Sequence, residues 1–167
     1  MNAGVIGLGD MGSGLAKNLM ANGFECWGHD LLDTRLDAFR QMGGQVAVDA
    51  ADVGRHASAV FVMVMNGDQA KDVILNGLRS TMAPGGTILL TATIKPREAR
   101  EIGQALEGSG LNLIDSPVSG GFHGAQGGTL TMMAAAPGDL LDDLAPVMEA
   151  VSANIQRVGT APGEGQT

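Results

Sequence analysis

The sequence has few cysteines, few aromatic residues and few basic residues. Cys26 is the single cysteine among 167 residues, which excludes an internal disulfide and a cysteine metal cluster and is compatible with a reducing cytoplasm. Phe, Trp and Tyr together make up 3% of the chain, so we expect a core of Val, Ile, Leu, Met and Ala. Ten basic residues against 18 acidic ones give a net charge of −8, which argues against a nucleic-acid partner.

Long apolar runs are also missing. The longest, residues 57–65, is about half the length that crosses a membrane. The first residues have the pattern of a strand rather than of a signal peptide, so we expect a soluble, cytoplasmic protein with no membrane partner. No two of the three histidines have metal-ligand spacing, and no metal is expected. A hydrophobic content of 44% with 17% charged residues indicates one globular domain.

A glycine-rich turn opens the chain. Val5 and Ile6 form a short apolar run, and a GxGxxG pattern follows at Gly7, Gly9 and Gly12. Apolar residues then recur at helical spacing, so the stretch predicts a strand, a tight turn and a helix. In dinucleotide-binding folds the first glycine permits the turn, the second lets a pyrophosphate approach the backbone, and the third lets helix and strand pack closely.

The context of this motif separates it from a plain turn. An acidic residue, Asp30, ends a second strand-like run (residues 24–28) about 20 residues further on, where a carboxylate can accept both ribose hydroxyls of an adenosine. Such a carboxylate repels a 2′-phosphate, so we expect NAD rather than NADP. Arg35 could soften this preference, but we interpret it as a solvated charge on a helix.

Strand-like and helical segments alternate over the first two thirds of the chain. Further strands are predicted at residues 46–48, 59–65, 87–90 and 111–114, with amphipathic segments between them. The alternation predicts a twisted parallel sheet with right-handed crossovers. Because ligands bind beyond the carboxyl ends of such strands, Val64, Met65 and Asn66 are expected along the path of a cofactor.

The alternation stops at Asp115. Residues 115–128 (DSPVSGGFHGAQGG) are predicted to be a loop between two strands. In this loop Ser119, Gly120 and Gly121 offer a hydroxyl and bare backbone amides, which suits a carboxylate site, although a long hairpin is the alternative interpretation. The remaining predicted elements are a strand at 129–134, an amphipathic helix ending near Val151, and a last strand at 155–158.

Three ordered signatures resemble those of one family. They are GLGDMG at 7–12, DSPVSGG at 115–121 with GTLTMM at 128–133, and GEGQT at 163–167. With them the chain is similar over its whole length to the β-hydroxyacid dehydrogenases, which include 3-hydroxyisobutyrate dehydrogenase, tartronate semialdehyde reductase, L-threonate dehydrogenase and, more distantly, 6-phosphogluconate dehydrogenase. The second signature is the more specific one.

The resemblance implies an α/β fold, namely a Rossmann-type, doubly wound, mostly parallel sheet with extra mixed strands at one edge. Residues 1–167 would form the NAD(P)-binding domain, and an all-helical domain that completes the active site and makes a homo-oligomer would lie outside this chain. The cofactor, NAD rather than NADP, is expected to contact Gly7, Leu8, Gly9, Asp10, Met11, Gly12, Asp30, Met65, Asn66 and Thr93. The substrate carboxylate is expected at Ser119, Gly120 and Gly121, with His123 beside them.

The catalytic lysine of the family follows a GxGxxxK pattern. Gly163 and Gly165 fit it, and the lysine would fall two residues past Thr167, so no catalytic residue is expected in this chain. Lys17 and Lys71 are expected to be solvated. Lys95 is the one lysine beside Thr93, but it lies outside the motif. Because alcohol oxidation needs a proton acceptor, we expect the cofactor domain of a larger dehydrogenase that binds NAD weakly and does not turn over.

The expected substrate is a small hydroxy acid that is threonate-, hydroxyisobutyrate- or tartronate-semialdehyde-like. Met65, Asn66 and the WGHD stretch (27–30) look like the threonate branch, whereas GTL (128–130) resembles the tartronate semialdehyde branch. A non-catalytic nucleotide-binding module, such as an NAD sensor, is the alternative function. Flavin or S-adenosylmethionine binding on the same fold is disfavoured by Asp30 and the DSPVSGG segment.

Overall fold

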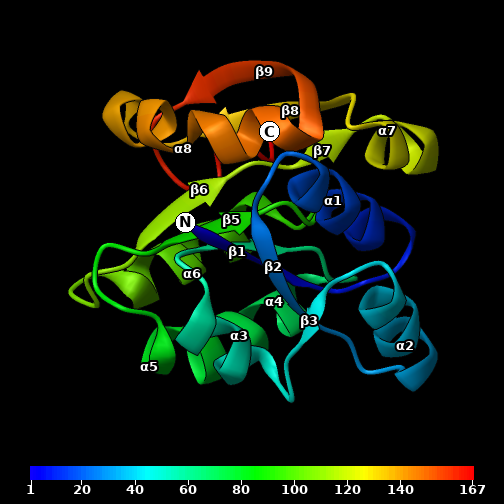
Figure 1. Cartoon of the computed structure of the whole chain (residues 1–167). Helices are drawn as coiled ribbons and strands as arrows, with labels where there is room; N and C mark the ends of the chain where they lie inside the picture. Colours follow the sequence, from blue (N-terminus) through cyan, green and yellow to red (C-terminus); the bar gives the residue numbers. More distant parts are fainter.

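A computed structural model describes residues 1–167 as a single sheet with helices on both faces (Figure 1). The strands are β1 (Asn2–Ile6), β2 (Glu25–His29), β3 (Gln45–Val46), β4 (Ala59–Val62), β5 (Thr87–Leu90), β6 (Asn112–Asp115), β7 (Val118–Ser119), β8 (Leu130–Ala135) and β9 (Ser152–Gly159). The helices are α1 (Asp10–Ala21), α2 (Asp33–Gln41), α3 (Ala50–His56), α4 (Gly67–Val73), the π-helical η1 (Ile74–Leu78), α5 (Arg79–Thr81), α6 (Pro96–Leu106), α7 (Gly121–Gly127) and α8 (Gly138–Val151).

The sheet confirms the predicted fold class. Six parallel strands lie in the order β3-β2-β1-β4-β5-β6, and the direction of the strand order reverses between β1 and β4. At the far edge β8 runs antiparallel to β6 and β7 and parallel to β9, so this edge is mixed as expected. A doubly wound sheet of this order binds its ligand at the reversal point, outside the carboxyl ends of the strands.

Each face of the sheet has its own apolar core. One core includes Leu15 and Leu19 of α1 together with Leu141 and Val147 of α8. The other is formed by residues of α3, α4, η1 and α6 against β4 and β5. Aliphatic side chains make up most of both cores, as the low aromatic content predicts, and Phe39 and Phe61 add two aromatic rings to the first. Figure 1 shows α1, α7 and α8 on the side of the sheet opposite α3 to α6.

Two predicted boundaries differ from the structure. Strand β4 ends at Val62, not at residue 65, although the Met63 amide still donates to the Ile6 carbonyl oxygen. The chain turns outward there, and Met65 is 85% exposed at the carboxyl edge of the sheet. The amphipathic segment predicted between the strands at 59–65 and 87–90 is also divided, because its α-helix α4 ends at Val73 and continues as the π-helical η1.

The predicted loop at residues 115–128 is wrong, since it contains β7 and α7. Helix α7 has seven residues, three of them glycine, so its helical propensity is low. Tertiary contacts with α1 hold it. The Asn18 Nδ2 group donates to the Ala125 carbonyl oxygen at 2.8 Å and to that of Gln126 at 3.0 Å, which satisfies free carbonyls at the end of α7.

Gly14 allows α1 and α7 to touch through their backbones. A β-carbon at Gly14 would lie 2.6 Å from the carbonyl carbon of Ala125 and 2.7 Å from its oxygen. These atoms belong to a packed backbone and cannot turn aside as a long side chain can. The distance between the two helices therefore depends on this glycine.

We expect Gly14→Ala to lower the free energy of unfolding, measured by urea denaturation. Overpacking costs about 1–3 kcal/mol, and the higher helix propensity of alanine returns up to about 1 kcal/mol. Gly138→Ala, in the first turn of α8, is the control because a β-carbon there meets only Arg157 Nη1, at 3.7 Å. Equal stability of the two variants would show that α7 does not depend on close contact with α1.

Candidate functional site

The glycine turn between β1 and α1 has the geometry that its spacing predicts. Gly7 has φ +93°, and a β-carbon there would overlap the Met63 carbonyl oxygen. A β-carbon on Gly12 would overlap the Gly7 carbonyl oxygen, so the helix start packs directly on the turn. At Gly9 the nearest atom to a β-carbon is 3.5 Å away, in the Arg35 guanidinium. The second glycine therefore leaves space at the surface of the turn.

This space lies at the N-terminus of α1. Gly9 is the N-cap residue, and no side chain caps the helix. The first N–H groups of a helix have no intrahelical partner, and the helix dipole favours an anion beside them. Open backbone with free N–H groups fits the pyrophosphate of a dinucleotide, so the residues present suit this cofactor.

Asp30 is bound into the protein rather than free. It is 8% exposed, and its Oδ2 accepts a hydrogen bond from the Leu8 amide at 2.7 Å while Oδ1 accepts one from the Leu32 amide at 2.9 Å. Arg35, expected to be a solvated charge, forms an ion pair with Oδ2 at 3.4 Å. The carboxylate thus ties the glycine turn to the end of β2, and its acceptor capacity is partly used.

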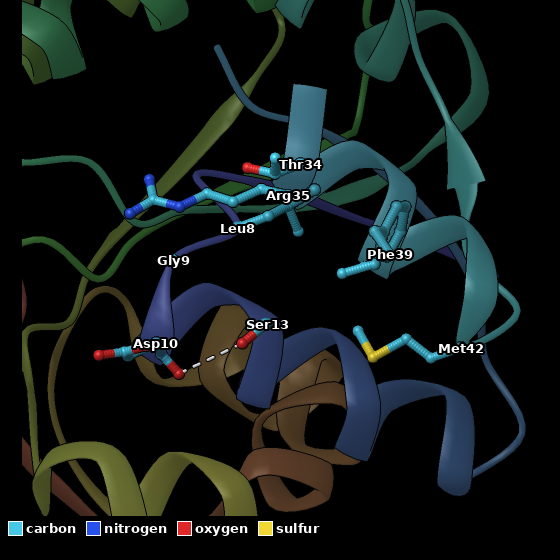
Figure 2. A pocket seen from close by; sticks show the side chains of 9 residues that line it. Leu8, Gly9, Asp10, Ser13, Thr34, Arg35, Phe39 and Met42 are labelled. Carbon is cyan, nitrogen blue, oxygen red and sulfur yellow. Dashed lines mark hydrogen bonds between the residues drawn. The ribbon is translucent and has the colours of Figure 1, made fainter. Parts of the chain in front are cut away.

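Two hollows flank Asp30. One, of about 300 Å³, lies between the glycine turn and α2 and is lined by residues that include Gly9, Ser13, Thr34 and Arg35 (Figure 2). The other, of about 280 Å³, lies between the end of β2 and the helical segments α3, α4 and η1. It is lined by His29, Leu31, Asp49, Ala50, Ala51, Asp72, Val73, Asn76 and Gly77. The sequence patterns did not indicate the α3 and α4 residues of this second hollow.

The segment predicted to hold a carboxylate is exposed. Ser119 ends β7, and Gly120 and Gly121 follow with φ +133° and +60°, backbone conformations that L side chains rarely adopt. His123 is exposed and lies edge-on to Phe122, with ring centroids 5.6 Å apart. The hydroxyl and the two glycines are therefore accessible to a small ligand.

Helix α7 brings this segment to the glycine turn. The Gln126 Nε2 group donates to the Asp10 carbonyl oxygen at 3.3 Å and to Ser13 Oγ at 3.4 Å, in the first turn of α1. Gly9 and Ser119 thus lie at the same edge of the sheet. The exposed residues Met65, Asn66 and Thr93 follow β4 and β5, so the structure brings them to this edge as well. Gln126 and Asn18, which make these links, were missed because nothing in the sequence pairs them.

A second network, also missed, surrounds Asp115 at the end of β6. This carboxylate is fully buried and accepts hydrogen bonds from the amides of Gly163 (2.7 Å) and Gly165 (3.2 Å) and from Gln166 Nε2 (2.8 Å). Burial raises the pKa of Asp115, and these three donors oppose the shift. The position of the acidic Asp115 directly after the apolar run 111–114 is the sequence signal that could have indicated this network.

Gln166 extends this network to the loop that carries Thr93. Its Nε2 donates to the Ala92 carbonyl oxygen at 3.1 Å, and its Oε1 accepts from the Ile94 amide at 3.1 Å. The GEGQT segment is therefore attached both to β6 and to the β5–α6 loop. Whatever follows residue 167 starts from this edge of the sheet.

The remaining side chains that could take part in catalysis lie outside this edge network or are exposed. Lys71 forms an ion pair with Glu101, which lowers the pKa of Glu101, and Lys95 is exposed at the start of α6. Burial raises the pKa of the Cys26 thiol to about 12, so it stays protonated. His56 stacks on Trp27 with ring centroids 3.7 Å apart.

Comparison with known proteins identifies the family. The profile described as the NAD binding domain of 6-phosphogluconate dehydrogenase matches residues 2–159. The chain belongs to this family. It is 36% identical over 169 residues to an L-threonate dehydrogenase of Escherichia coli, a match that covers 99% of this chain and 56% of the relative.

Solved structures of this NAD-binding domain agree with the fold. A 3-hydroxyisobutyrate dehydrogenase from Salmonella typhimurium superposes with a TM-score of 0.94 at 33% identity, over 99% of this chain and 59% of that one. One from Mycobacterium tuberculosis, described with L-serine, gives 0.95 at 28% identity, over 99% and 56%. The chain therefore spans a little over half the length of these relatives. None of its helices has the length and apolarity needed to cross a membrane.

The Asp115 network predicts a pH dependence of stability. Because its pKa is raised above 3.8 on folding, the native state holds this proton more tightly than the unfolded state does. The contribution of Asp115 to the free energy of unfolding is then largest below about pH 4 and decreases as the pH rises through the raised pKa. We expect the free energy of unfolding of the wild type, relative to that of Asp115→Asn, to decrease from about pH 3 to about pH 7. Urea denaturation of both proteins at several pH values in this range measures it.

A relative stability that rises with pH would contradict this. It would show that the three N–H donors stabilise the anion more than burial destabilises it, and that the folded pKa of Asp115 lies below 3.8.

Proposed function

We propose that residues 1–167 form the cofactor-binding domain of an NAD-dependent dehydrogenase that acts on a small hydroxy acid. The observation that carries this proposal is the placement of an open glycine turn and a serine- and glycine-bearing segment at one edge of the sheet, joined by Gln126. A dinucleotide and a small acid can meet there. Membership of the NAD-binding family and the named activities of the relatives support the same function.

The cofactor would lie along the carboxyl edge of the sheet. Gly9 and the first amides of α1 would hold the pyrophosphate, Asp30 the adenosine ribose, and the hollow beyond β2 the adenine. The loops that carry Met65, Asn66 and Thr93 would border the nicotinamide end. Bound NAD would supply the hydride acceptor of the reaction.

The substrate carboxylate would bind at Ser119, Gly120 and Gly121. One hydroxyl and two amides supply three hydrogen-bond donors to an anion, and His123 stands at the rim of the same segment. L-threonate is the first candidate, since it is the substrate named for the E. coli relative, and 3-hydroxyisobutyrate and L-serine are the others. All three are small acids with a hydroxyl group.

The proton acceptor would come from outside the chain. A lysine two positions beyond Thr167 would start from the edge that Asp115 and Gln166 fix, and a helical domain would close the site. We further propose that the whole protein is a cytoplasmic homo-oligomer. By itself the 167-residue chain would bind NAD without oxidising a substrate.

Gly9→Ala tests the proposed pyrophosphate site. The methyl group fits the free protein, because the nearest atoms lie 3.5 Å away, but it would occupy the space that the pyrophosphate needs. We expect the Kd for NAD, measured by calorimetry, to rise at least about tenfold, the equivalent of one lost hydrogen bond or more, while the melting temperature stays unchanged. Gly138→Ala is the control for both readouts. Unchanged NAD affinity of Gly9→Ala would contradict the proposed site.

A second test addresses catalysis. The chain mixed with NAD and L-threonate should produce no NADH absorbance at 340 nm above a protein-free control, because no positioned base is present. NADH formation would show that the base lies within residues 1–167, and Lys95→Ala would then identify whether it is Lys95. Extending the chain through the following lysine and helical domain should restore turnover.

A further inference from the structure

The side-chain amide of Gln166 bridges the backbone on both sides of Thr93. Its Nε2 group donates to the Ala92 carbonyl oxygen at 3.1 Å, and its Oε1 accepts from the Ile94 amide at 3.1 Å. Ala92 and Ile94 are buried, whereas Thr93 between them is exposed. The bridge therefore fixes the backbone that carries Thr93 and leaves the Thr93 side chain accessible at the carboxyl edge of the sheet.

The partners of Gln166 also fix the orientation of its amide. A backbone N–H can only donate and a carbonyl oxygen can only accept, so Oε1 must face Ile94 and the NH₂ group must face Ala92. The second N–H of that group donates to Asp115 Oδ1 at 2.8 Å. Both N–H groups and the oxygen of this amide are thus in use, and an aliphatic side chain of the same length could make none of these bonds.

The segment that carries Gln166 is closely packed as well. Gly163 has φ +97°, and a β-carbon there would lie 3.0 Å from the Pro96 carbonyl oxygen at the start of α6. A β-carbon on Gly165 would lie 2.5 Å from the Asp115 carbonyl oxygen at the end of β6. The backbone of the GEGQT segment therefore rests directly on both elements, and Gln166 reaches the β5–α6 loop from a fixed position.

We propose that Gln166 is a positioning residue that acts on the bound dinucleotide through Thr93. It holds the β5–α6 loop in the conformation in which the Thr93 hydroxyl contacts the nicotinamide end of the cofactor. In this role Gln166 does not touch the cofactor itself. Without the bridge the Ala92 carbonyl and the Ile94 amide lose their partner, and the loop adopts other conformations. This inference rests on the proposed dinucleotide site.

The test compares NAD with ADP-ribose, which lacks the nicotinamide, in calorimetric titrations of the wild type and of Gln166→Met. Methionine is unbranched like glutamine, and its thioether is at most a weak acceptor. We expect the wild type to bind NAD at least about threefold more tightly than ADP-ribose. In Gln166→Met the Kd for NAD should rise about three- to tenfold, as for a lost hydrogen bond, while that for ADP-ribose changes less than about twofold.

Two further variants accompany this comparison. Gln104→Met replaces an exposed glutamine of α6 and is the matched control, which should change neither constant. Gln166→Glu keeps the acceptor for the Ile94 amide and removes both donors, so it should show the same selective loss of NAD affinity as Gln166→Met. Melting temperatures without ligand verify that each variant is folded, and Gln166→Glu decides the test if Gln166→Met does not fold.

A double-mutant cycle with Thr93→Val shows whether the effect passes through Thr93. Thr93→Val removes the hydroxyl and should by itself raise the Kd for NAD about three- to tenfold without changing that for ADP-ribose. Adding Gln166→Met to Thr93→Val should then raise the Kd for NAD by less than about a further twofold, because the contact is already lost. Effects of the two substitutions that multiply would contradict the proposed route through Thr93.

Three other results would overturn the role of Gln166 while NAD binding, and with it the proposed function, stands. They are an equal loss of NAD and ADP-ribose affinity in the Gln166 variants, no change in either affinity, and equal Kd values of the two ligands for the wild type. The first would show a purely structural role. A wild type that binds neither ligand would instead contradict the proposed function itself.

Discussion

The close backbone contact of α1 with its two neighbours is the constraint on which the site depends. Gly12 lets the start of α1 rest on the Gly7 carbonyl, and Gly14 lets the next turn rest on Ala125 of α7. Bulkier residues at either position would separate the elements. Because both contacts lie in the first turns of one helix, the glycine turn and the serine-bearing segment hold a fixed relation without any loop between them.

Buried carboxylates fix the rest of the same edge. Asp30 ties the glycine turn to the end of β2, and Asp115 ties the GEGQT segment to the end of β6. In both cases two of the donors are backbone amides and one is a side chain, so each carboxylate holds chain segments in place as well as a side chain. Gln166 adds the β5–α6 loop to this arrangement. The segments at this edge of the sheet are thus hydrogen-bonded to one another through the buried carboxylates of Asp30 and Asp115 and the partly buried Gln166.

The sequence patterns predicted the elements that depend on interactions between near neighbours in the sequence or on a regular spacing of buried residues. The GxGxxG turn, the apolar parallel strands and the amphipathic segments between them follow from such patterns, and all are present. Helix α7 was not predictable in this way, because its three glycines oppose helix formation and its stability comes from contact with Asn18 and Gly14, over 100 residues earlier. Separation in the sequence also hides the links from Gln126 to Asp10, 116 residues apart, and from Gln166 to Asp115, 51 residues apart.

Arg35 shows a different limit. Its spacing from Leu36 and Phe39 places it on a helix, and a charge there is normally solvated. In the structure the side chain instead reaches across to Gly9, because Asp30 lies where it can form an ion pair with the guanidinium. Residue type and spacing therefore predicted a dinucleotide site, whereas the ion pair between Asp30 and Arg35 became visible only in the fold.

We propose that a bound dinucleotide lies between the glycine turn and the Ser119 segment, at the same edge of the sheet. Titrating ¹⁵N-labelled chain with NAD and following the backbone amide resonances tests it most directly. We expect shifts concentrated in Gly9 to Gly12 and in Gly120 and Gly121, with β9 unaffected. Shifts confined to the glycine turn, or spread over the opposite edge of the sheet, would contradict it.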